Sequence, residues 1–300
     1  MSAAAPARQP AAPLAGIAML TAAAIGYGGN IPYARLAGDL GVSGVDAVAL
    51  RCACILPMFA AAAWATRTSL AVPRADRVKL LWLGLTTALT GMGYLSAIAF
   101  IPVGVAVMVF YTFPLVILLL SPLVDKVPLR PVQLAAFGLA FFGIALAIGP
   151  SFGALDWRGL ALAGLASIGG ASQFFIASRA PGGGGLATLT WLHAVILPIA
   201  LLASLASGGP APWARVEAAA WPLFVTSALY IGAVILQIRG MRTTRAAVAG
   251  LVCCLEPVVA TVSAGLLLGE RLTIAHYVGG AFVLAGILVG LARQPAPKPA

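Results

Sequence analysis

The chain has 300 residues, of which 61% are hydrophobic and 9% are charged, and its mean hydropathy is +1.03. A soluble globular domain carries about 25% charged residues, so this composition excludes an ordinary soluble enzyme or binding module. The net charge of +10 does not indicate nucleic-acid binding, because the cations stand singly or in short groups between apolar runs. The composition therefore predicts a polytopic membrane protein that is surrounded by lipid.

Ten apolar runs follow one another along the chain, each long enough to cross about 30 Å of hydrocarbon as a helix. We expect the first five helices at residues 13–34, 47–65, 80–100, 103–123 and 132–148. We expect the other five at 159–176, 186–205, 218–238, 246–267 and 273–291. The first run is too long for a signal-peptide core, and only short tails, 1–12 and 292–300, flank the helices. The sequence predicts an all-α membrane protein without a soluble catalytic domain.

One fixed offset of 143 residues relates the two halves of the chain. The matched pairs are Gly16 with Gly159, Gly26 with Gly169, Asn30 with Gln173, Pro114 with Pro257, and Gly143 with Gly286. A single ungapped offset across several helices indicates an internal repeat rather than chance. Because five is an odd number, the second copy enters the membrane from the opposite side. We predict two inverted five-helix repeats, 13–148 and 159–291, an architecture that exposes a central site to each side in turn.

The lysines and arginines predict how the chain is oriented. With the N-terminus inside, the outer segments and outer helix ends hold only Arg35, Arg51, Arg158, Arg215 and Arg271 of the 18 cations. The other 13 fall on the inner side. Because cytoplasmic loops are enriched in positive charge, we expect both termini in the cytoplasm.

Three motifs in the last two apolar runs carry a family resemblance. They are Leu255-Glu256-Pro257-Val258, then Leu268-Gly269-Glu270-Arg271-Leu272, then Gly279-Gly280 with Gly286. In order and spacing they resemble the closing hairpin of the drug/metabolite transporter superfamily, EamA type. The resemblance implies a ten-helix inner-membrane carrier whose cavity is formed by helices one to four and six to nine. At the offset of 143, however, Glu270 corresponds to Val127, so a paired gate of charges is not reproduced.

Glu256 is the only acidic residue near the middle of a predicted helix. A carboxyl group in the membrane is costly, and it typically carries a proton or pairs with a substrate cation. The alternative is that Glu256 bonds to a neighbouring helix and fixes packing. Pro114 and Pro257 each remove a mid-helix hydrogen bond, so both predict kinks that either let gates bend or shape the packing.

Arg51 lies about one turn inside the second apolar run. It is a candidate for binding a substrate carboxylate, and snorkelling to the outer interface is the alternative. The other polar and aromatic residues inside helices are too many to face lipid, so some of them should line a cavity. They are Tyr27, Asn30, Tyr94, Tyr111, Gln173, Trp191, His193, Tyr230 and Gln237.

Two classes of function fit these features unequally. A secondary transporter that exports small metabolites is favoured, with amino acids, aromatic ones included, as leading substrates and multidrug efflux of lipophilic cations as the alternative. An intramembrane enzyme is a remote alternative, because the chain has two histidines, no H-E-x-x-H motif and no second mid-membrane acid. The four cysteines match no zinc spacing, so we expect no metal and no cofactor. The partners that we expect are the substrate and the bilayer, with the chain a monomer or a weak homodimer.

Overall fold

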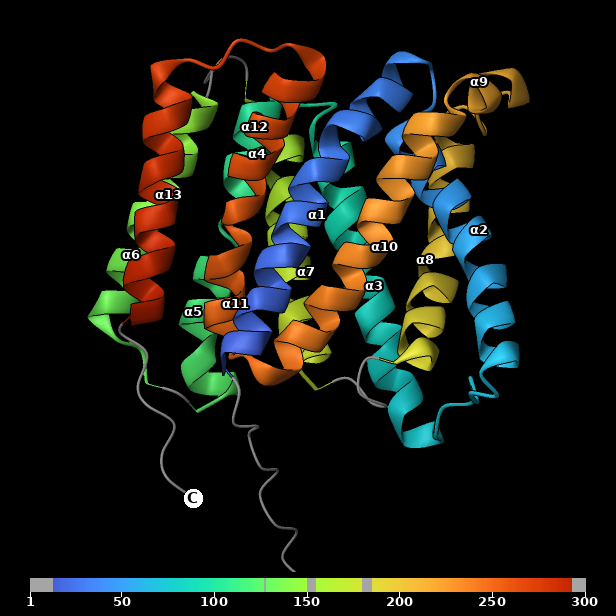
Figure 1. Cartoon of the computed structure of the whole chain (residues 1–300), viewed down its shortest axis with the longest axis horizontal. Coiled ribbons are helices and arrows are strands. Elements are labelled where there is room, and N and C mark those ends of the chain that lie inside the picture. The colour runs from blue at the N-terminus through green and yellow to red at the C-terminus, as the bar shows by residue number, and fades with distance from the viewer. Residues whose placement is uncertain (1–12, 127, 150–154, 180–184, 293–300) are drawn as a thin grey trace, which may run out of the picture.

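The computed structural model describes residues 13–126, 128–149, 155–179 and 185–292. Within these ranges it holds ten helical spans that are long and apolar enough to cross a membrane, and it holds no strand. The spans stand side by side in one bundle, and α1 (Pro13–Asp39) begins at the same end of the bundle at which α13 (Ile274–Ala292) finishes (Figure 1). This is the all-α architecture that the ten apolar runs predict.

The first repeat holds five spans, of which the fourth consists of two helices. After α1 come α2 (Gly44–Ala65), α3 (Arg74–Ala97), α4 (Val103–Phe110) with α5 (Phe113–Val124), and α6 (Pro131–Ile148). In this half α3 differs most from prediction, since it begins six residues before the expected position of 80. Its added first turn carries Asp76, which pairs with Lys79 at 3.0 Å, so these charged residues extend the helix beyond the apolar run.

The second repeat follows the same plan. Its helices are α7 (Trp157–Ala177), α8 (Leu186–Ala206), α10 (Ala220–Thr243), α11 (Ala246–Cys253) with α12 (Leu255–Leu268), and α13, and the short helix α9 (Trp213–Ala218) lies between α8 and α10. The fourth span of each repeat is therefore broken near its middle. Each break lies just before a proline, Pro114 or Pro257, whose nitrogen has no hydrogen to donate to the preceding turn.

Helices pack mainly against helices of the opposite repeat. α1 contacts α10 and α12, and its counterpart α7 contacts α3 together with α4 and α5. Two further major pairs join equivalent helices: α6 with α13 at one edge of the bundle, and α2 with α8 at the other (Figure 1). α8 also packs against α3 of the first repeat. The two inverted repeats are thus interlocked, so neither one forms a separate bundle.

Glycines matched by the repeat offset lie at equivalent helix crossings. A Cβ atom on Gly26 of α1 would lie 3.2 Å from the carbonyl oxygen of Leu229 on α10. A Cβ atom on Gly169 of α7 would lie 3.1 Å from the carbonyl oxygen of Thr86 on α3. Because side chains at these points would force the backbones apart, the glycines permit the close approach that joins the repeats.

Candidate functional site

Glu256 lies in the first turn of α12, directly after the break in the ninth span. At the break, the Cys254 amide donates to the carbonyl of Leu251 at 3.1 Å, three residues back, and Pro257 has no amide hydrogen. The chain therefore leaves the α-helical pattern for about one residue and then resumes it. The break sets the half-buried Glu256 carboxyl group at the N-terminal end of a new helix, near the middle of the ninth span.

Three tyrosines from three different helices surround the Glu256 carboxyl group. The Tyr111 hydroxyl, at the end of α4, is its hydrogen-bonding partner. Tyr27 of α1 and Tyr94 of α3 lie close enough for the Glu256 charge to act on their hydroxyls. This arrangement surrounds one acid with phenol groups and aromatic rings, and a substrate cation can contact both.

An aromatic wall continues from these tyrosines along the break in the fourth span. The Phe110 ring lies 5.6 Å from the Tyr94 ring and 5.3 Å from the Phe113 ring, and Phe113 in turn lies 5.3 Å from Phe174 of α7. Phe113 is the repeat equivalent of Glu256 at the offset of 143. The site is therefore chemically asymmetric although the fold is symmetric, with an acid in one half and a phenylalanine in the other.

Arg51 of α2 is turned onto an aromatic ring within the bundle. Its guanidinium carbon lies 3.7 Å from the centroid of the Tyr230 ring on α10. Its Nε atom is buried without a hydrogen-bond partner, and no ion pair to Arg51 occurs within the described residues. A cation–π contact compensates only part of the cost of removing a guanidinium from water. Arg51 is thus a cation that lacks an anion.

His193 of α8 belongs to the same group as Arg51. Its ring is completely buried, and it lies edge-on to Tyr230 and to Phe59, with centroids 5.9 Å and 5.8 Å away. Its Nδ1 lies 2.7 Å from the carbonyl oxygen of Leu189 and, in the neutral tautomer that donates there, Nε2 is an acceptor. That Nε2 atom is buried without a partner, like the Nε of Arg51.

Tyr27 joins the Arg51 group to the Glu256 group. Its hydroxyl donates to Oε1 of Gln237 at 2.7 Å, and its ring lies edge-on to Tyr230 with centroids 5.9 Å apart. The charges of both Arg51 and Glu256 act on this hydroxyl. The structure therefore brings together eight of the predicted residues, from α1, α2, α3, α4, α8, α10 and α12, in one polar region with a cation at one end and an acid at the other.

The other three predicted residues lie outside these contacts. Asn30 donates to the Tyr27 carbonyl at 2.6 Å within α1, and it accepts from Thr226 of α10 at 3.1 Å, so the second bond joins α1 to α10. Trp191 donates its indole N–H to the carbonyl of Leu70 at 3.1 Å and so fixes the segment after α2. Gln173 is buried on α7, and within the described ranges no hydrogen bond joins it to Arg51 or Glu256.

The sequence analysis did not identify Asp46, a buried carboxylate near the start of α2. Ser204 of α8 donates to Oδ1 at 2.5 Å, and Ser43 donates to Oδ2 at 2.7 Å while its hydroxyl oxygen accepts from the Asp46 amide at 3.1 Å. The Ser-x-x-Asp spacing at a helix start is the signal that predicts the local half of this network. With both oxygens bonded, Asp46 has a structural role in joining α2 to α8.

Two ion pairs join the repeats at opposite ends of the bundle. Arg35, near the end of α1, pairs with Glu270 between α12 and α13. Arg179, after α7, pairs with Asp125, after α5, at 2.5 Å. The two pairs join equivalent elements of the repeats. At the offset of 143, however, Arg179 lies one residue past the position that matches Arg35, and Glu270 lies two residues past the position that matches Asp125. The ion-pair partner of Glu270 is Arg35 of the first helix, and not the adjacent Arg271.

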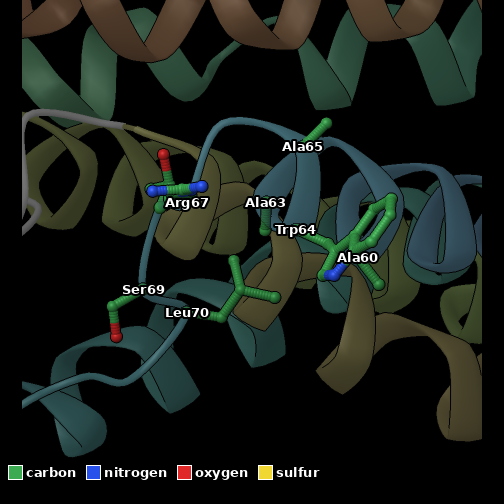
Figure 2. A pocket seen from close by; sticks show the side chains of 8 residues that line it. Ala60, Ala63, Trp64, Ala65, Arg67, Ser69 and Leu70 are labelled. Atoms are coloured by element: carbon green, nitrogen blue, oxygen red, sulfur yellow. The ribbon is translucent and has the colours of Figure 1, made fainter.

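An open hollow lies away from this polar region. It measures about 760 Å³ and is formed by the end of α2 and the segment that follows it (Figure 2). Across the described ranges, no three histidine, cysteine or carboxylate side chains gather as a metal site requires. In the polar region, Arg51 and Glu256 carry opposite charges, and both act on the hydroxyl of Tyr27.

Comparisons with known proteins agree with this architecture. The model of the EamA-like transporter family matches the chain twice, at residues 14–149 and 157–291. The chain is similar to a solved structure described only as "Crystal structure of protein", with a TM-score of 0.70 and 20% sequence identity. The match covers 91% of this chain and 99% of the chain in that structure. At that identity the likeness concerns the fold alone. No curated protein matches the chain.

Proposed function

We propose that this chain, which belongs to the EamA-like transporter family, is a secondary transporter that exports small zwitterionic metabolites by alternating access. Members of the family are membrane transporters of small molecules and not enzymes. The leading substrates are amino acids, aromatic ones included. The membrane in which it acts is the cell inner membrane, with both termini in the cytoplasm.

The unpaired state of Arg51 is the observation that carries this proposal. A guanidinium is charged at every physiological pH, and a buried charge needs a counter-charge or strong hydrogen bonds. The Arg51 guanidinium contacts the face of the Tyr230 ring, and no carboxylate of the described residues forms an ion pair with it. A substrate carboxylate supplies the missing anion, and the planar guanidinium can bind it through two parallel hydrogen bonds.

Glu256 is the corresponding site for the other end of a zwitterion. Its carboxyl group faces Tyr111 and lies near Tyr27 and Tyr94, so an ammonium group there meets both a negative charge and aromatic faces. The wall of Phe110 and Phe113 beside these tyrosines gives an aromatic side chain a surface for edge and face contacts. Each part of an aromatic amino acid thus has a counterpart in the bundle.

The two ion pairs support alternating access. Arg35–Glu270 holds α1 to the α12–α13 connection at one end, and Arg179–Asp125 holds α7 to the end of α5 at the other. Because inverted repeats can exchange conformations, opening one end of the bundle separates one pair while the second pair holds the opposite end closed. Each pair is partly exposed, so breaking it costs little and can be repeated in every cycle.

Efflux of lipophilic cations is the second candidate, and Glu256 with its tyrosines favours it. Such a substrate fits the acid and the aromatic wall. It gains nothing from Arg51, however, and the charge of that residue repels it. The two candidates therefore differ in whether Arg51 is needed.

Counterflow in liposomes, with a panel of labelled amino acids and cationic dyes, tests the proposal. We expect amino acid exchange without dye movement, and we expect Arg51→Gln to lower that exchange at least about tenfold. Arg158→Gln, which removes an exposed arginine at the start of α7, is the matched control and should leave exchange unchanged. Dye movement alone, or normal amino acid exchange by Arg51→Gln, would reverse the assignment.

A further inference from the structure

The hollow at the end of α2 is amphipathic. Ala60, Ala63 and Leu70 give it apolar walls, and Arg67, Thr68 and Ser69 line its polar side. Trp64, whose side chain is 85% exposed, stands beside these walls (Figure 2). All of these residues come from the last turns of α2 and the segment after it. The hollow lies at the end of a membrane span, where hydrocarbon gives way to polar headgroups.

Arg67 occupies a backbone position that normally belongs to glycine. The Arg67 amide donates to Trp64 at 3.2 Å and the Thr68 amide donates to Ala63 at 2.9 Å, which is the Schellman pattern at the end of a helix. The pattern places Arg67 at a φ of 52°, in the left-handed region that disfavours side chains. At the corresponding end of α8 in the other repeat, the positive φ angles belong to Gly208 and Gly209.

This backbone conformation indicates that the Arg67 side chain has a role of its own. A side chain at a strained position that glycine occupies more easily points to a function for that side chain. Within the described residues the Arg67 guanidinium has no hydrogen bond or ion pair, so its donors are free at the mouth of the hollow. The same segment continues into α3 with Arg74, Arg77 and Lys79 against a single acid, Asp76.

We propose that this hollow binds an anionic phospholipid, with the headgroup phosphate on Arg67 and the hydroxyls of Thr68 and Ser69 and an acyl chain along Ala60, Ala63 and Trp64. Charge complementarity selects the headgroup, since the segment from Arg67 to Lys79 carries four cations and one acid. The apolar walls select a lipid over a free phosphate, because a soluble anion leaves them without a partner. An exposed tryptophan beside the headgroup is typical of the membrane interface.

Lipid titration of the purified full chain in a nonionic detergent tests this site. The probes are dioctanoyl phosphatidylglycerol, dioctanoyl phosphatidylcholine and glycerol 3-phosphate, and the readout is the apparent Kd from the rise in Tm with ligand concentration. We expect phosphatidylglycerol to stabilise the protein more than phosphatidylcholine, and glycerol 3-phosphate to have no effect. Arg67→Gln should raise the apparent Kd for phosphatidylglycerol about fivefold.

Two further variants separate binding from folding. Arg74→Gln removes a cation of the same segment that does not line the hollow, and it should change the apparent Kd less than twofold. Arg67→Gly suits the left-handed backbone, so its Tm without lipid should equal or exceed that of the wild type, while its apparent Kd for phosphatidylglycerol should rise as much as that of Arg67→Gln. Equal losses from Arg67→Gln and Arg74→Gln would overturn the site in favour of diffuse attraction. Equal stabilisation by glycerol 3-phosphate, or by phosphatidylcholine, would overturn the choice of ligand.

Discussion

A Cβ atom on Gly28 would lie 2.6 Å from the backbone carbonyl oxygen of Glu256 and 2.9 Å from the amide nitrogen of Ala260. The first helix thus touches the backbone of α12 at the residue that carries the acid. The Cβ atom of Val259 would also lie 2.6 Å away. No side chain fits at this crossing, because these three atoms belong to the backbone of α12 or are fixed directly to it. The position of the Glu256 carboxyl group therefore depends on a glycine in a helix more than 200 residues earlier in the chain.

Gly28→Ala should displace α12 and lower transport. Overpacking of this kind costs about 1–3 kcal/mol, so we expect a lower Tm for the purified protein together with slower substrate exchange in liposomes. Gly29→Ala is the matched control, since a Cβ atom there meets only a Leu229 methyl group at 3.9 Å. Equal behaviour of the two variants would contradict this account of the crossing.

The ten spans could be predicted from the sequence because span length follows from the thickness of the bilayer. Expected and observed ends agree most closely where an apolar run is bounded by loop residues, as at 186–205 and Leu186–Ala206. They differ where a helix continues beyond the apolar run. α1 extends past Arg35 to Asp39, because a charged side chain at the interface reaches water and, here, a partner in Glu270.

The candidate site could be predicted only in part. Glu256 and Arg51 stand out because charge is rare in a membrane span. Their surroundings cannot be read from the sequence, since the contact of Arg51 with Tyr230 depends on how α2 and α10 pack. The ion pair of Arg179 with Asp125 was missed for another reason: connections between helices vary in length, so charges that match in space do not match at a fixed offset.

Reversing one charge of an end-closing ion pair should slow transport, and exchanging both charges should restore it. Arg35→Glu places two acids together at the end of the bundle that this pair joins, and we expect exchange to fall about fivefold, equivalent to about 1 kcal/mol. Glu270→Arg in the same chain recreates the pair with its charges exchanged, and the rate should return to within about twofold of the wild type. The measurement is substrate exchange in liposomes for each single and double variant.

The pair of Lys79 with Asp76 serves as the control for this series. Both residues lie on α3, so their contact does not change when helices move relative to one another. Lys79→Glu should leave exchange unchanged. A comparable loss of exchange in Lys79→Glu, or no recovery of exchange in the double variant of Arg35 and Glu270, would contradict this role. The charges would then act through the overall electrostatic field of the protein and not by holding one end of the bundle closed.

Cysteine labelling tests the orientation in the membrane. Arg74, at the start of α3, and Arg242, near the end of α10, lie at the end of the bundle where α1 begins, whereas Arg215 of α9 lies at the other end (Figure 1). In a cysteine-free background, cysteines at the first two positions should resist an impermeant thiol reagent in intact cells, because the side with more cations faces the cytoplasm. Labelling of Arg74→Cys, with protection of Arg215→Cys, would invert the topology.

Glu256→Gln separates a role in transport from a role in packing. Glutamine is nearly isosteric and keeps a hydrogen bond to Tyr111, so a packing role predicts nearly normal exchange. A role in binding a substrate ammonium or a proton requires the carboxyl group itself. In that case we expect Glu256→Gln to lower turnover at least about tenfold, equivalent to about 1.4 kcal/mol, while the yield of folded protein is unchanged. Glu217→Gln, which alters an exposed acid of α9, controls for loss of charge alone.

The two roles for Glu256 differ in which assay fails. If Glu256 carries the coupling proton, Glu256→Gln should lose uphill transport driven by a pH gradient and retain substrate exchange, because exchange involves no net movement of protons. If the carboxylate binds the substrate ammonium, both activities should fall together, since the amide has no charge to offer. Parallel assays of uphill transport and counterflow on one liposome preparation distinguish these outcomes. Wild-type activity in both assays would assign Glu256 to the packing of α12 against α1 and α4.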